Sequence, residues 1–409
     1  MFLRWIPLII VILIVEWYAF QAIKTAFNNK WLLGVYSLIV VLVLGNFFWQ
    51  FFGYDRTEGW THAIAYAIGF FVALASLQIV LFSFLFLEDV LRLLKAFVDF
   101  FSERRSFDIP YRRRFISQIA IGLGAIPFAS LLYGMYQGRY NYKVLNYTLE
   151  YDDLPEEFNG FKITQISDLH CGSFDNFEKV AYGVDLINQQ KGDVILFTGD
   201  LVNSVAKEAA PWVKLFSKIT APFGKFSVLG NHDYGDYTEW ESISAKEKNL
   251  QDLFNFHQEM GFDLLLNESR KIEKNGNKIA IIGVENWGAG RFKKAGDLSK
   301  SLTEVNENDV KRLLTHDPSH WDAEVLPHQF PFQLTLSGHT HGFQFGIEIP
   351  GWFKWSPIKW RYKQWAGIYE SENQKLNVNR GFGYLAYPGR VGIWPEITVI
   401  TLKKKNSLV

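Results

Sequence analysis

The chain has 409 residues and carries 42 basic and 42 acidic side chains. This balance argues against a nucleic-acid-binding protein, which is normally basic, and against an acidic tail. The single cysteine, Cys171, excludes an intrachain disulfide, and we expect it to be a small apolar filler rather than a metal ligand or nucleophile. Apolar and aromatic runs dominate residues 1–140, whereas residues 146–409 have the composition of a soluble domain, so we expect two parts.

Four apolar stretches in the first part are long enough to cross a bilayer, whose hydrocarbon core needs about 20 residues of helix. They are residues 3–22, 31–53, 61–87 and 115–136. Aromatic residues near their ends are typical of a membrane interface: Trp5, Trp17, Tyr18, Trp31, Trp49 and Trp60. We therefore predict a transmembrane anchor of four helices. Glu16, within the first stretch, is expected to face other helices or the interface.

The connection between the third and fourth stretches is strongly basic. It carries Arg92, Lys95, Arg104, Arg105, Arg112, Arg113 and Arg114, whereas segments 23–30 and 54–60 together carry Lys24, Lys30 and Arg56. Because positive loops stay cytoplasmic, we expect a multi-pass protein of the cytoplasmic (inner) membrane with its second part on the periplasmic or extracellular side. The sequence RRRF before the fourth stretch also resembles a twin-arginine export signal, which predicts the same side.

Five strand-like runs in the second part each end in residues of the types that bind metals. FKITQISDLH ends in Asp168 and His170, DVILFTGDLVN in Asp200 and Asn203, KFSVLGNHDY in Asn231, His232 and Asp233, VKRLLTHDP in His316, and FQLTLSGHTHG in His339 and His341. A surface His-x-His pair arises by chance, so the last run alone is weak evidence. Open α/β sheets place ligand sites beyond the carboxyl ends of their strands, and we expect these ends to meet.

This order of motifs resembles the calcineurin-like metallophosphoesterase superfamily, over about residues 150–400. The ending VNRGFGYLAYPGRVGIWPEITVITL is similar to its membrane-anchored bacterial branch. One departure is Phe343, where that branch commonly has a glycine; this concerns the mouth of the site more than the metals. The resemblance implies an α/β fold in which a four-helix transmembrane region (1–140) precedes a four-layer α/β sandwich (146–409) of two mixed sheets flanked by helices.

The resemblance also implies a site for two divalent metal ions, held by two sets of three ligands and one shared residue. The sets are Asp168, His170, His341 and Asn231, His316, His339, with Asp200 bridging both ions. Nitrogen and oxygen ligands suit Mn, Fe or Zn over Ca or Mg. Two dications and two aspartates leave a positive site that attracts phosphate, and coordination lowers the pKa of water from 15.7 to about 7.

Two further residues are assigned catalytic roles. His232, beside Asn231, is expected to stabilise the transition state or to protonate the leaving oxygen; the alternative is a structural histidine. Asp233 is expected to orient its neighbours rather than to react, and Asn203 to support the geometry of its loop.

Other signals compete with these assignments. His320 and His328 are rivals to His316, but neither ends an apolar run. RGFGYLA, residues 380–386, fits a dinucleotide-binding pattern but lacks the helix that should follow it, so we expect a loop. Arg380 within it either touches substrate phosphate or forms a structural salt bridge.

Residues 351–369, GWFKWSPIKWRYKQWAGIY, interleave aromatic with basic side chains. Such a mixture suits a bilayer interface or an entrance for lipid phosphate. It equally suits a hydrophobic hairpin packed on the domain with its charges solvated, and the sequence does not choose between the two.

We therefore expect a metal-dependent phosphoric ester hydrolase that cleaves a phosphate ester or pyrophosphate of a lipid or lipid-linked substrate at the outer face of the membrane. One alternative shares the chemistry but faces the cytoplasm and cleaves nucleotide-linked lipids. A second is a catalytically inactive binding domain, which the complete ligand set and His232 disfavour.

Overall fold

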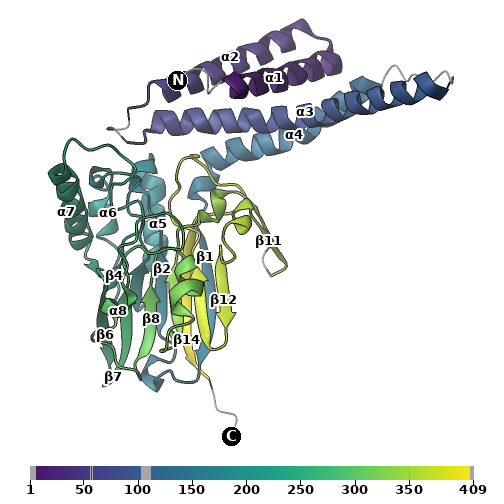
Figure 1. The fold of residues 1–409 in the computed structure, drawn as a ribbon. Coiled ribbons are helices and arrows are strands. Elements are labelled where there is room, and N and C mark those ends of the chain that lie inside the picture. The colour runs from purple at the N-terminus through teal and green to yellow at the C-terminus, as the bar shows by residue number, and fades with distance from the viewer. Residues whose placement is uncertain (1–5, 56, 58, 103–111, 350, 406–409) are drawn as a thin grey trace. The chain divides into compact units, whose positions relative to one another are not determined.

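The computed structural model describes residues 6–55, 57, 59–102, 112–349 and 351–405 (Figure 1). The chain forms two compact units. The helical unit comprises Met1–Tyr54 and Ala63–Met135, and the α/β unit comprises Asp55–His62 and Tyr136–Val409.

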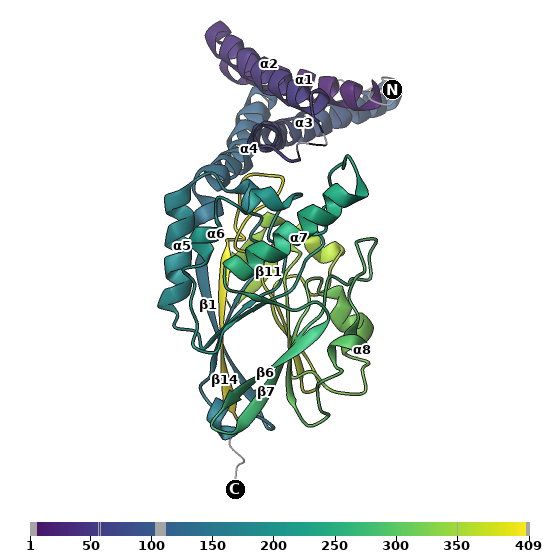
Figure 2. The same cartoon turned by 90° about the vertical axis from the view of Figure 1, so that its left-hand side faces the viewer.

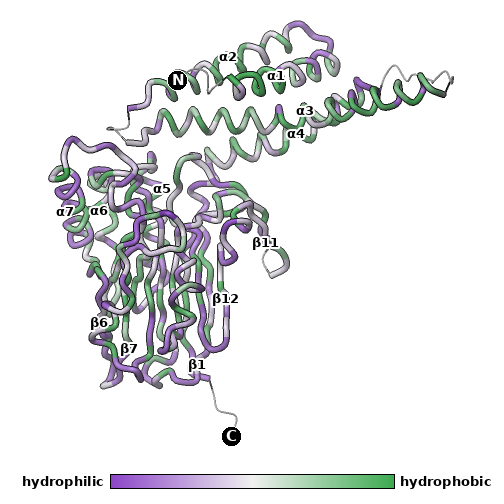
Figure 3. The backbone as a smooth tube through the Cα atoms, viewed as in Figure 1, coloured by the Kyte–Doolittle hydropathy of each residue, from purple (hydrophilic) through white to green (hydrophobic). Residues whose placement is uncertain are grey.

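The helical unit contains the four predicted membrane-crossing helices, which confirms the four-helix expectation. They are α1 (Ile6–Phe27), α2 (Lys30–Phe52), α3 (His62–Ser102) and α4 (Arg112–Tyr136). All four are long and apolar enough to cross a membrane, and their hydrophobic colouring is continuous over most of their length (Figure 3). Many large apolar side chains on them are exposed, including Trp31 at 85% and Val41 at 66%, as expected for surfaces that contact lipid.

Helix α3 is longer than the sequence pattern predicts. We expected a connection to begin after residue 87, but the helix continues through Ser102 and has 41 residues, about twice the length that a bilayer needs. Residues 88–102 are rich in helix-forming side chains, and Glu88 and Arg92 pair one turn apart at 2.9 Å. The basic residues Arg92 and Lys95 therefore lie on a helix rather than in a loop.

Glu16 faces neighbouring helices, which was one of the two expectations for it. The phenol of Tyr36 on α2 donates a hydrogen bond of 2.8 Å to its carboxylate, and the amide of Gln78 on α3 donates another. Gln78 Nε2 also lies 3.1 Å from Tyr36 Oη. The carboxylate is thus hydrogen-bonded within the helical unit, as a polar group in an apolar environment requires.

The α/β unit contains two six-stranded mixed sheets and a small hairpin (Figure 1). The first sheet has the order β1 (Lys143–Tyr151), β14 (Glu396–Lys404), β2 (Lys162–Ile166), β3 (Val194–Phe197), β4 (Lys225–Ser227) and β5 (Asp263–Leu264). The second has the order β12 (Gly367–Ser371), β13 (Gln374–Val378), β9 (Leu334–Ser337), β8 (Val310–Leu314), β7 (Asn277–Gly283) and β6 (Glu268–Lys274). The hairpin pairs β10 (Ile347–Ile349) with β11 (Phe353–Trp355).

Alternation of apolar side chains along the strands builds four layers. In β3, Leu196 packs between the two sheets, whereas Ile195 and Phe197 face the helices on the outer side. Those helices are α5 (Phe177–Gln189), α6 (Val213–Phe216) and α7 (Ile243–Glu259). On the other side, α8 (Leu298–Ser301) and the turn of helix at Trp321–Val325 cover the second sheet (Figure 2). The four-layer α/β sandwich predicted from the sequence is confirmed.

The sheet topology brings five strand ends to one edge of the sandwich. Strands β2, β3 and β4 run parallel in the first sheet, and β8 and β9 run parallel in the second. A hydrogen bond of 2.9 Å from Gln165 Nε2 to the carbonyl of Ser337 joins the two sheets just before β2 and β9 end. Every metal-type motif of the sequence follows one of these five strands, so all of them lie at the same edge.

Candidate metal centre

The loop after β2 and the loop after β9 form the first group of candidate ligands: Asp168, His170 and His341. Nε2 of His341 lies 3.2 Å from Oδ1 of Asp168 and 3.0 Å from Nε2 of His170. All three side chains are buried. The close approach of two imidazole nitrogens and a carboxylate oxygen is the arrangement of groups that share a cation.

A second group, Asp200, His316 and His339, comes from the loops after β3, β8 and β9. Oδ2 of Asp200 lies 3.1 Å from Nε2 of His316 and 3.5 Å from Nε2 of His170. Asp200 therefore touches both groups, which is the position that a bridging ligand needs. His339 and His341, two residues apart in the sequence, belong to different groups.

The backbone at this edge is held in an unusual conformation. Asp168, His170, Asp200, His339 and His341 all have positive φ, between 47° and 72°. Side-chain-bearing residues rarely adopt this left-handed region, although Asp and His tolerate it better than most. Five of the seven candidate ligands share it, and strain of this kind concentrates at functional sites because the surrounding structure must maintain it.

Main-chain carbonyls set the tautomers of two histidines. Nδ1 of His170 lies 3.1 Å from the carbonyl of Val202, and Nδ1 of His316 lies 2.7 Å from that of Thr198. A carbonyl only accepts a hydrogen bond, so each Nδ1 carries the proton that it donates. In its neutral form each ring then presents an unprotonated Nε2 to the site, which is the state that binds a metal.

Asn231, after β4, contributes an oxygen. Its Nδ2 donates a hydrogen bond of 2.7 Å to Tyr237 Oη, which fixes the orientation of the amide. Its Oδ1 is buried and has no hydrogen-bond partner among the residues that the structure describes. An unpaired buried oxygen costs about 1–3 kcal/mol, and a cation at this point would remove that cost. The donor set thus fits two ions that prefer nitrogen and oxygen ligands.

His232 and Asp233 lie beside these groups but bond differently. Nδ1 of His232 donates to the carbonyl of Asn203 at 2.6 Å, and its ring stacks on Tyr237 with centroids 4.3 Å apart. Asp233 accepts hydrogen bonds from the main-chain N–H groups of Asp200 at 3.0 Å, Leu201 at 2.8 Å and Gly230 at 2.8 Å. Asp233 therefore ties the loop after β3 to the loop after β4.

We call the seven candidate ligands together the metal cage. The pKa values within it depend mainly on the charges of its own aspartates and histidines. Burial by itself would raise the pKa of Asp168, but the neighbouring His341 and His316 outweigh burial and lower it. Burial would lower the pKa of His316, but Asp200 outweighs it and raises the pKa to about 10. Burial and the charge of Asp200 raise the pKa of Asp233 to about 7. A cation bound between Asp200 and His316 would compete with the proton that this pairing favours.

Two glycines make room for the carboxylates. A Cβ atom added to Gly230 would lie 2.2 Å from Oδ1 of Asp200, and one added to Gly338 would lie 2.2 Å from Oδ2 of Asp168. Both separations are shorter than any van der Waals contact, so only glycine leaves these carboxylates in place.

Sequence reasoning missed three residues that support the histidines. Tyr362 Oη lies 2.8 Å from Nε2 of His339, and it donates toward Oδ2 of Asp317 at 3.5 Å. Arg390 is fully buried, with Nη2 lying 3.2 Å from Nδ1 of His341 and 2.8 Å from the carbonyl of Arg380. Burial lowers the pKa of Arg390 to about 9. Their only signals were a tyrosine within the aromatic-basic segment, an aspartate after His316 and an arginine in the C-terminal motif.

The positions of His320, His328 and Arg380 distinguish between the alternative roles considered for them. His320 stacks on Trp287 and bonds to Glu324 at 3.1 Å, and His328 contacts Phe330, whereas His316 reaches Asp200. Arg380 pairs with Glu396 and Glu348, so its role is the structural salt bridge that we considered. Residues 380–386 form no helix or strand, as expected.

Part of the aromatic-basic segment 351–369 packs on the α/β unit and part is exposed, so each of the two alternatives for this segment fits a different part of it. Trp365 is buried with Ala366 and Ile393, so part of the segment packs on the unit. Trp352 and Trp360 are 81% and 76% exposed, so another part presents large aromatic side chains to its surroundings. Tyr362 contacts the site, which neither interpretation foresaw.

A cavity of about 300 Å³ opens onto the candidate ligands. Besides six of the nine predicted site residues, its lining includes Phe292, Ile358, Arg361, Tyr362 and Leu385. Phe343, whose position is commonly glycine in the resembling branch, is 58% exposed and has a φ of 59°, a conformation that glycine adopts freely.

Comparison with known proteins agrees with this geometry. Residues 3–139 match the profile of the calcineurin-like phosphoesterase transmembrane domain, and residues 161–343 match that of the calcineurin-like phosphoesterase. The metallophosphoesterase YkuE of Bacillus subtilis is 31% identical over 301 residues, which cover 72% of this chain and 98% of YkuE. A transmembrane protein with metallophosphoesterase domain from Danio rerio is 27% identical over 375 residues, covering 90% of this chain and 79% of that protein.

The match to YkuE extends over nearly the whole of that relative, and the two profiles match segments of both units of the chain. The chain therefore belongs to the calcineurin-like metallophosphoesterases, as a metal-dependent phosphoric ester hydrolase that carries a four-helix transmembrane domain at its N-terminus.

Proposed function

We propose that this protein uses two divalent ions to hydrolyse a phosphate ester or pyrophosphate of a lipid or lipid-linked substrate at the outer face of the cytoplasmic membrane. The observation that carries the reaction is the contact of Asp200 with both ligand groups: its Oδ2 lies 3.1 Å from His316 Nε2 and 3.5 Å from His170 Nε2. Asp168, His170 and His341 would hold one ion, and Asn231, His316 and His339 the other.

Bound ions of this kind polarise phosphoryl oxygens and make hydroxide available near neutral pH. The chain's own residues supply the remaining functions. His170 and His316 are fixed by the carbonyls of Val202 and Thr198, so their Nε2 atoms are oriented before an ion binds. The carboxylate of Asp233 accepts hydrogen bonds from main-chain N–H groups of the loops that carry Asp200 and Asn231, and so holds the two loops in a fixed relative position.

His232 is the residue assigned to the substrate. Its main-chain N–H donates to Oδ1 of Asp200 at 2.9 Å, and its Nδ1 is held by the carbonyl of Asn203, so the Nε2 edge is the part of the ring left for substrate. From there, in its imidazolium form with both ring nitrogens protonated, it would donate the Nε2 proton to the leaving oxygen or stabilise charge on the phosphoryl group. Such a contribution is typically worth about 10²–10⁴-fold in rate.

Two features support a lipid-linked substrate. The chain enters the α/β unit directly from a membrane-crossing helix, since α4 ends at Tyr136 and β1 begins at Lys143. In addition, Trp352, Phe353 and Trp360 are exposed in the same segment that supplies Arg361 and Tyr362 to the cavity. Aromatic side chains beside cations are typical of contacts with lipid headgroups.

The basic residues around the connection of α3 and α4 support the outward orientation. Positive residues favour the cytoplasmic side of a membrane, and Arg92, Lys95, Arg112, Arg113 and Arg114 lie toward this end of α3 and α4. With this end in the cytoplasm, α4 would carry the chain to the other side, where the α/β unit would lie.

Activity assays on purified full-length protein test the reaction and the substrate. Protein loaded with manganese should release phosphate from phospholipid or polyprenyl pyrophosphate more efficiently than from soluble nucleotides. The Asp200→Asn variant should lose bound metal, and its turnover should fall by more than about 100-fold. This is more than the loss of about 10–100-fold that is typical when a residue that only supports a ligand is replaced. A preference for nucleotides would overturn the lipid assignment, and a fully active Asp200→Asn variant would overturn the two-ion site.

Cysteine labelling in intact cells tests the orientation, and the chain offers a clean background because Cys171 is 1% exposed. A cysteine in place of exposed Asn373 should react with a membrane-impermeant maleimide. A cysteine in place of exposed Lys95 is the matched control and should react only after permeabilisation. The opposite pattern would place the α/β unit in the cytoplasm.

A further inference from the structure

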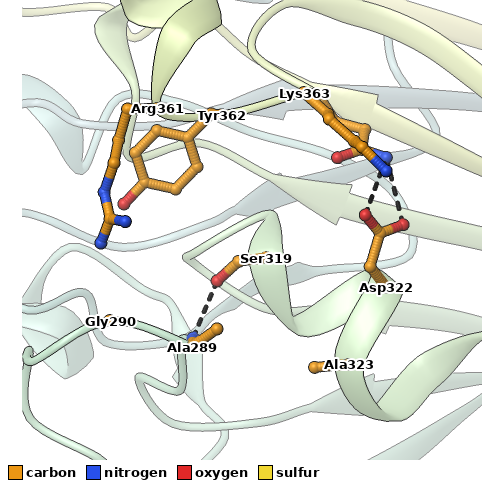
Figure 4. A pocket seen from close by; sticks show the side chains of 9 residues that line it. Ala289, Gly290, Ser319, Asp322, Ala323, Arg361, Tyr362 and Lys363 are labelled. Atoms are coloured by element: carbon orange, nitrogen blue, oxygen red, sulfur yellow. Dashed lines mark hydrogen bonds between the residues drawn. The ribbon is translucent and has the colours of Figure 1, made fainter.

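A second cavity lies next to the one that opens onto the candidate ligands. Its volume is about 340 Å³, similar to the 300 Å³ of the first. Arg361 and Tyr362 line both cavities, so these two side chains form a common wall. Ser319, Asp322, Lys363 and Gln364 line the second cavity but not the first. Figure 4 shows Ser319, Asp322 and Lys363 around the second cavity.

The cations of this cavity have no anionic partner among the described residues. Arg361 makes a cation–π contact with its neighbour Tyr362, at 5.7 Å, but neither Arg361 nor Lys363 forms an ion pair within the described part of the chain. Elsewhere on the same unit, some exposed cations, such as Lys278 and Lys403, are paired with carboxylates. The carboxylate of Asp322 is engaged by a neutral group, Nε2 of Gln364, at 3.1 and 3.2 Å.

The main-chain turn at residues 289–290 forms the wall of this cavity beside the guanidinium of Arg361. The N–H of Ala289 donates to Oγ of Ser319 at 2.9 Å, which joins the 289–290 turn to the segment that follows His316 (Figure 4). Among the residues that the structure describes, the hydroxyl of Ser319 has no acceptor, so its proton can be donated to a ligand. A Cβ atom on Gly290 would lie only 3.1 Å from Nη2 of Arg361, so the glycine lets the guanidinium lie close to the main chain.

From this arrangement we infer that the second cavity binds a second phosphate group of the substrate, while the first phosphate lies at the metal cage. The inference rests on the proposed function and narrows its substrate class to organic diphosphates or bisphosphates. A guanidinium presents paired N–H donors that match a phosphate group, and Lys363 adds a point charge. Arg361, which lines both cavities, lies where it can contact the oxygens between the two phosphates.

Matched substrates test this assignment on full-length, manganese-loaded protein. Geranyl monophosphate and geranyl diphosphate share one apolar tail and differ by one phosphate. The Lys363→Gln variant should lose about 10-fold or more in kcat/KM for the diphosphate and less than about 3-fold for the monophosphate, since a charge-assisted contact is the stronger kind of hydrogen bond. Arg361→Gln should show a larger loss for the diphosphate.

Lys359→Gln is the control, because Lys359 is an exposed cation of the same segment that lines neither cavity. It should leave both activities unchanged. Equal losses of Lys363→Gln on both substrates, or no loss on either, would overturn the inference.

A binding measurement separates this inference from the proposed reaction. Calorimetric titration with methylenediphosphonate, which resists hydrolysis, should show binding to wild-type protein that weakens about 10-fold or more in Lys363→Gln. Methylphosphonate, with a single phosphonate, should bind both proteins equally. If wild-type protein cleaves neither geranyl substrate, the proposed function fails, while the diphosphonate titration still decides whether the cavity holds a second phosphate. Equal diphosphonate affinity in both proteins would refute it.

Discussion

The phenol oxygen of Tyr362 lies 2.8 Å from Nε2 of His339 and 3.5 Å from Oδ2 of Asp317. Burial raises the pKa of this phenol well above its usual value, so it remains a protonated donor at neutral pH. If the phenol donates to Asp317, its oxygen accepts the proton on Nε2 of His339. The Nδ1 of His339 is then unprotonated and available to an ion, so Tyr362 sets the tautomer of a candidate ligand.

Replacing Tyr362 with Phe should weaken metal binding without removing a ligand. The change deletes the acceptor for Nε2–H of His339, and such losses typically cost 10–100-fold in metal affinity. Titration of metal-free protein with manganese measures the effect, and excess manganese should restore most of the activity. Trp360→Phe, at an exposed position of the same segment, serves as the control and should bind metal normally. Unchanged manganese affinity in Tyr362→Phe would show that the phenol does not orient His339.

Replacing His232 with Gln should lower kcat by about 10²–10⁴-fold while metal content stays at the wild-type level. The reason is that His232 bonds to the carbonyl of Asn203 and lies outside both ligand groups. If His232 protonates the leaving oxygen, the loss should be much smaller for p-nitrophenyl phosphate than for an alkyl phosphate, because nitrophenolate leaves without a proton. Loss of metal in this variant, measured by elemental analysis, would contradict the assignment.

Replacing Gly230 with Ala should disrupt the cage. The added methyl would lie 2.2 Å from Oδ1 of Asp200, so either the carboxylate or the main chain must move, at a cost of about 1–3 kcal/mol. We expect reduced metal content and a lower unfolding temperature. Gly122→Ala is the control, since a Cβ on this α4 residue meets no heavy atom within 4 Å. Full metal occupancy in Gly230→Ala would show that Asp200 does not need its present position.

The stability of the α/β unit should fall at acidic pH because of His257. This histidine is fully buried, stacks on Phe197 and bonds to Ser227 at 2.9 Å. Burial lowers its pKa from 6.5 to about 3. As the pH falls below 6.5, the unfolded chain takes up a proton that the folded chain excludes, so stability is lost between pH 6.5 and 3. From pH 7 to 5 the loss from this group is about 2 kcal/mol.

The comparison with His257→Gln isolates this effect, because glutamine does not titrate. Unfolding temperatures of both proteins in detergent should be measured from pH 5 to 8. The difference between them should be constant above about pH 7 and should shift against the wild type as the pH falls, according to the linkage of stability to proton uptake. Parallel profiles would show that another group governs acid sensitivity.

Local patterns in the sequence were sufficient for the membrane helices and for the identity of the candidate ligands. Apolar runs as long as 31–53 have no place to be buried except in lipid, so α2 at Lys30–Phe52 was predicted almost to the residue. Asp168, Asp200 and His316 directly follow apolar strands, and the carboxyl ends of parallel strands meet at one edge. In α3, the apolar pattern predicts a membrane span that ends at residue 87, but the helix continues to Ser102 because residues 88–102 favour helix and Glu88 pairs with Arg92.

Contacts between distant parts of the chain determined which residues orient the candidate ligands and which residues line the two cavities. Tyr362 reaches His339 because β10, β11 and the turn after them fold the aromatic-basic segment back over the loop after β9. Arg390 reaches His341 across 49 positions, and Arg361 joins two cavities whose other walls come from residues near 290 and 320. Sequence periodicity reports which face of an element is buried, but it carries no information on which distant side chain meets that face. Spacing along the chain therefore located the candidate ligands, and only the packing of the two sheets and their loops determined the groups that orient them.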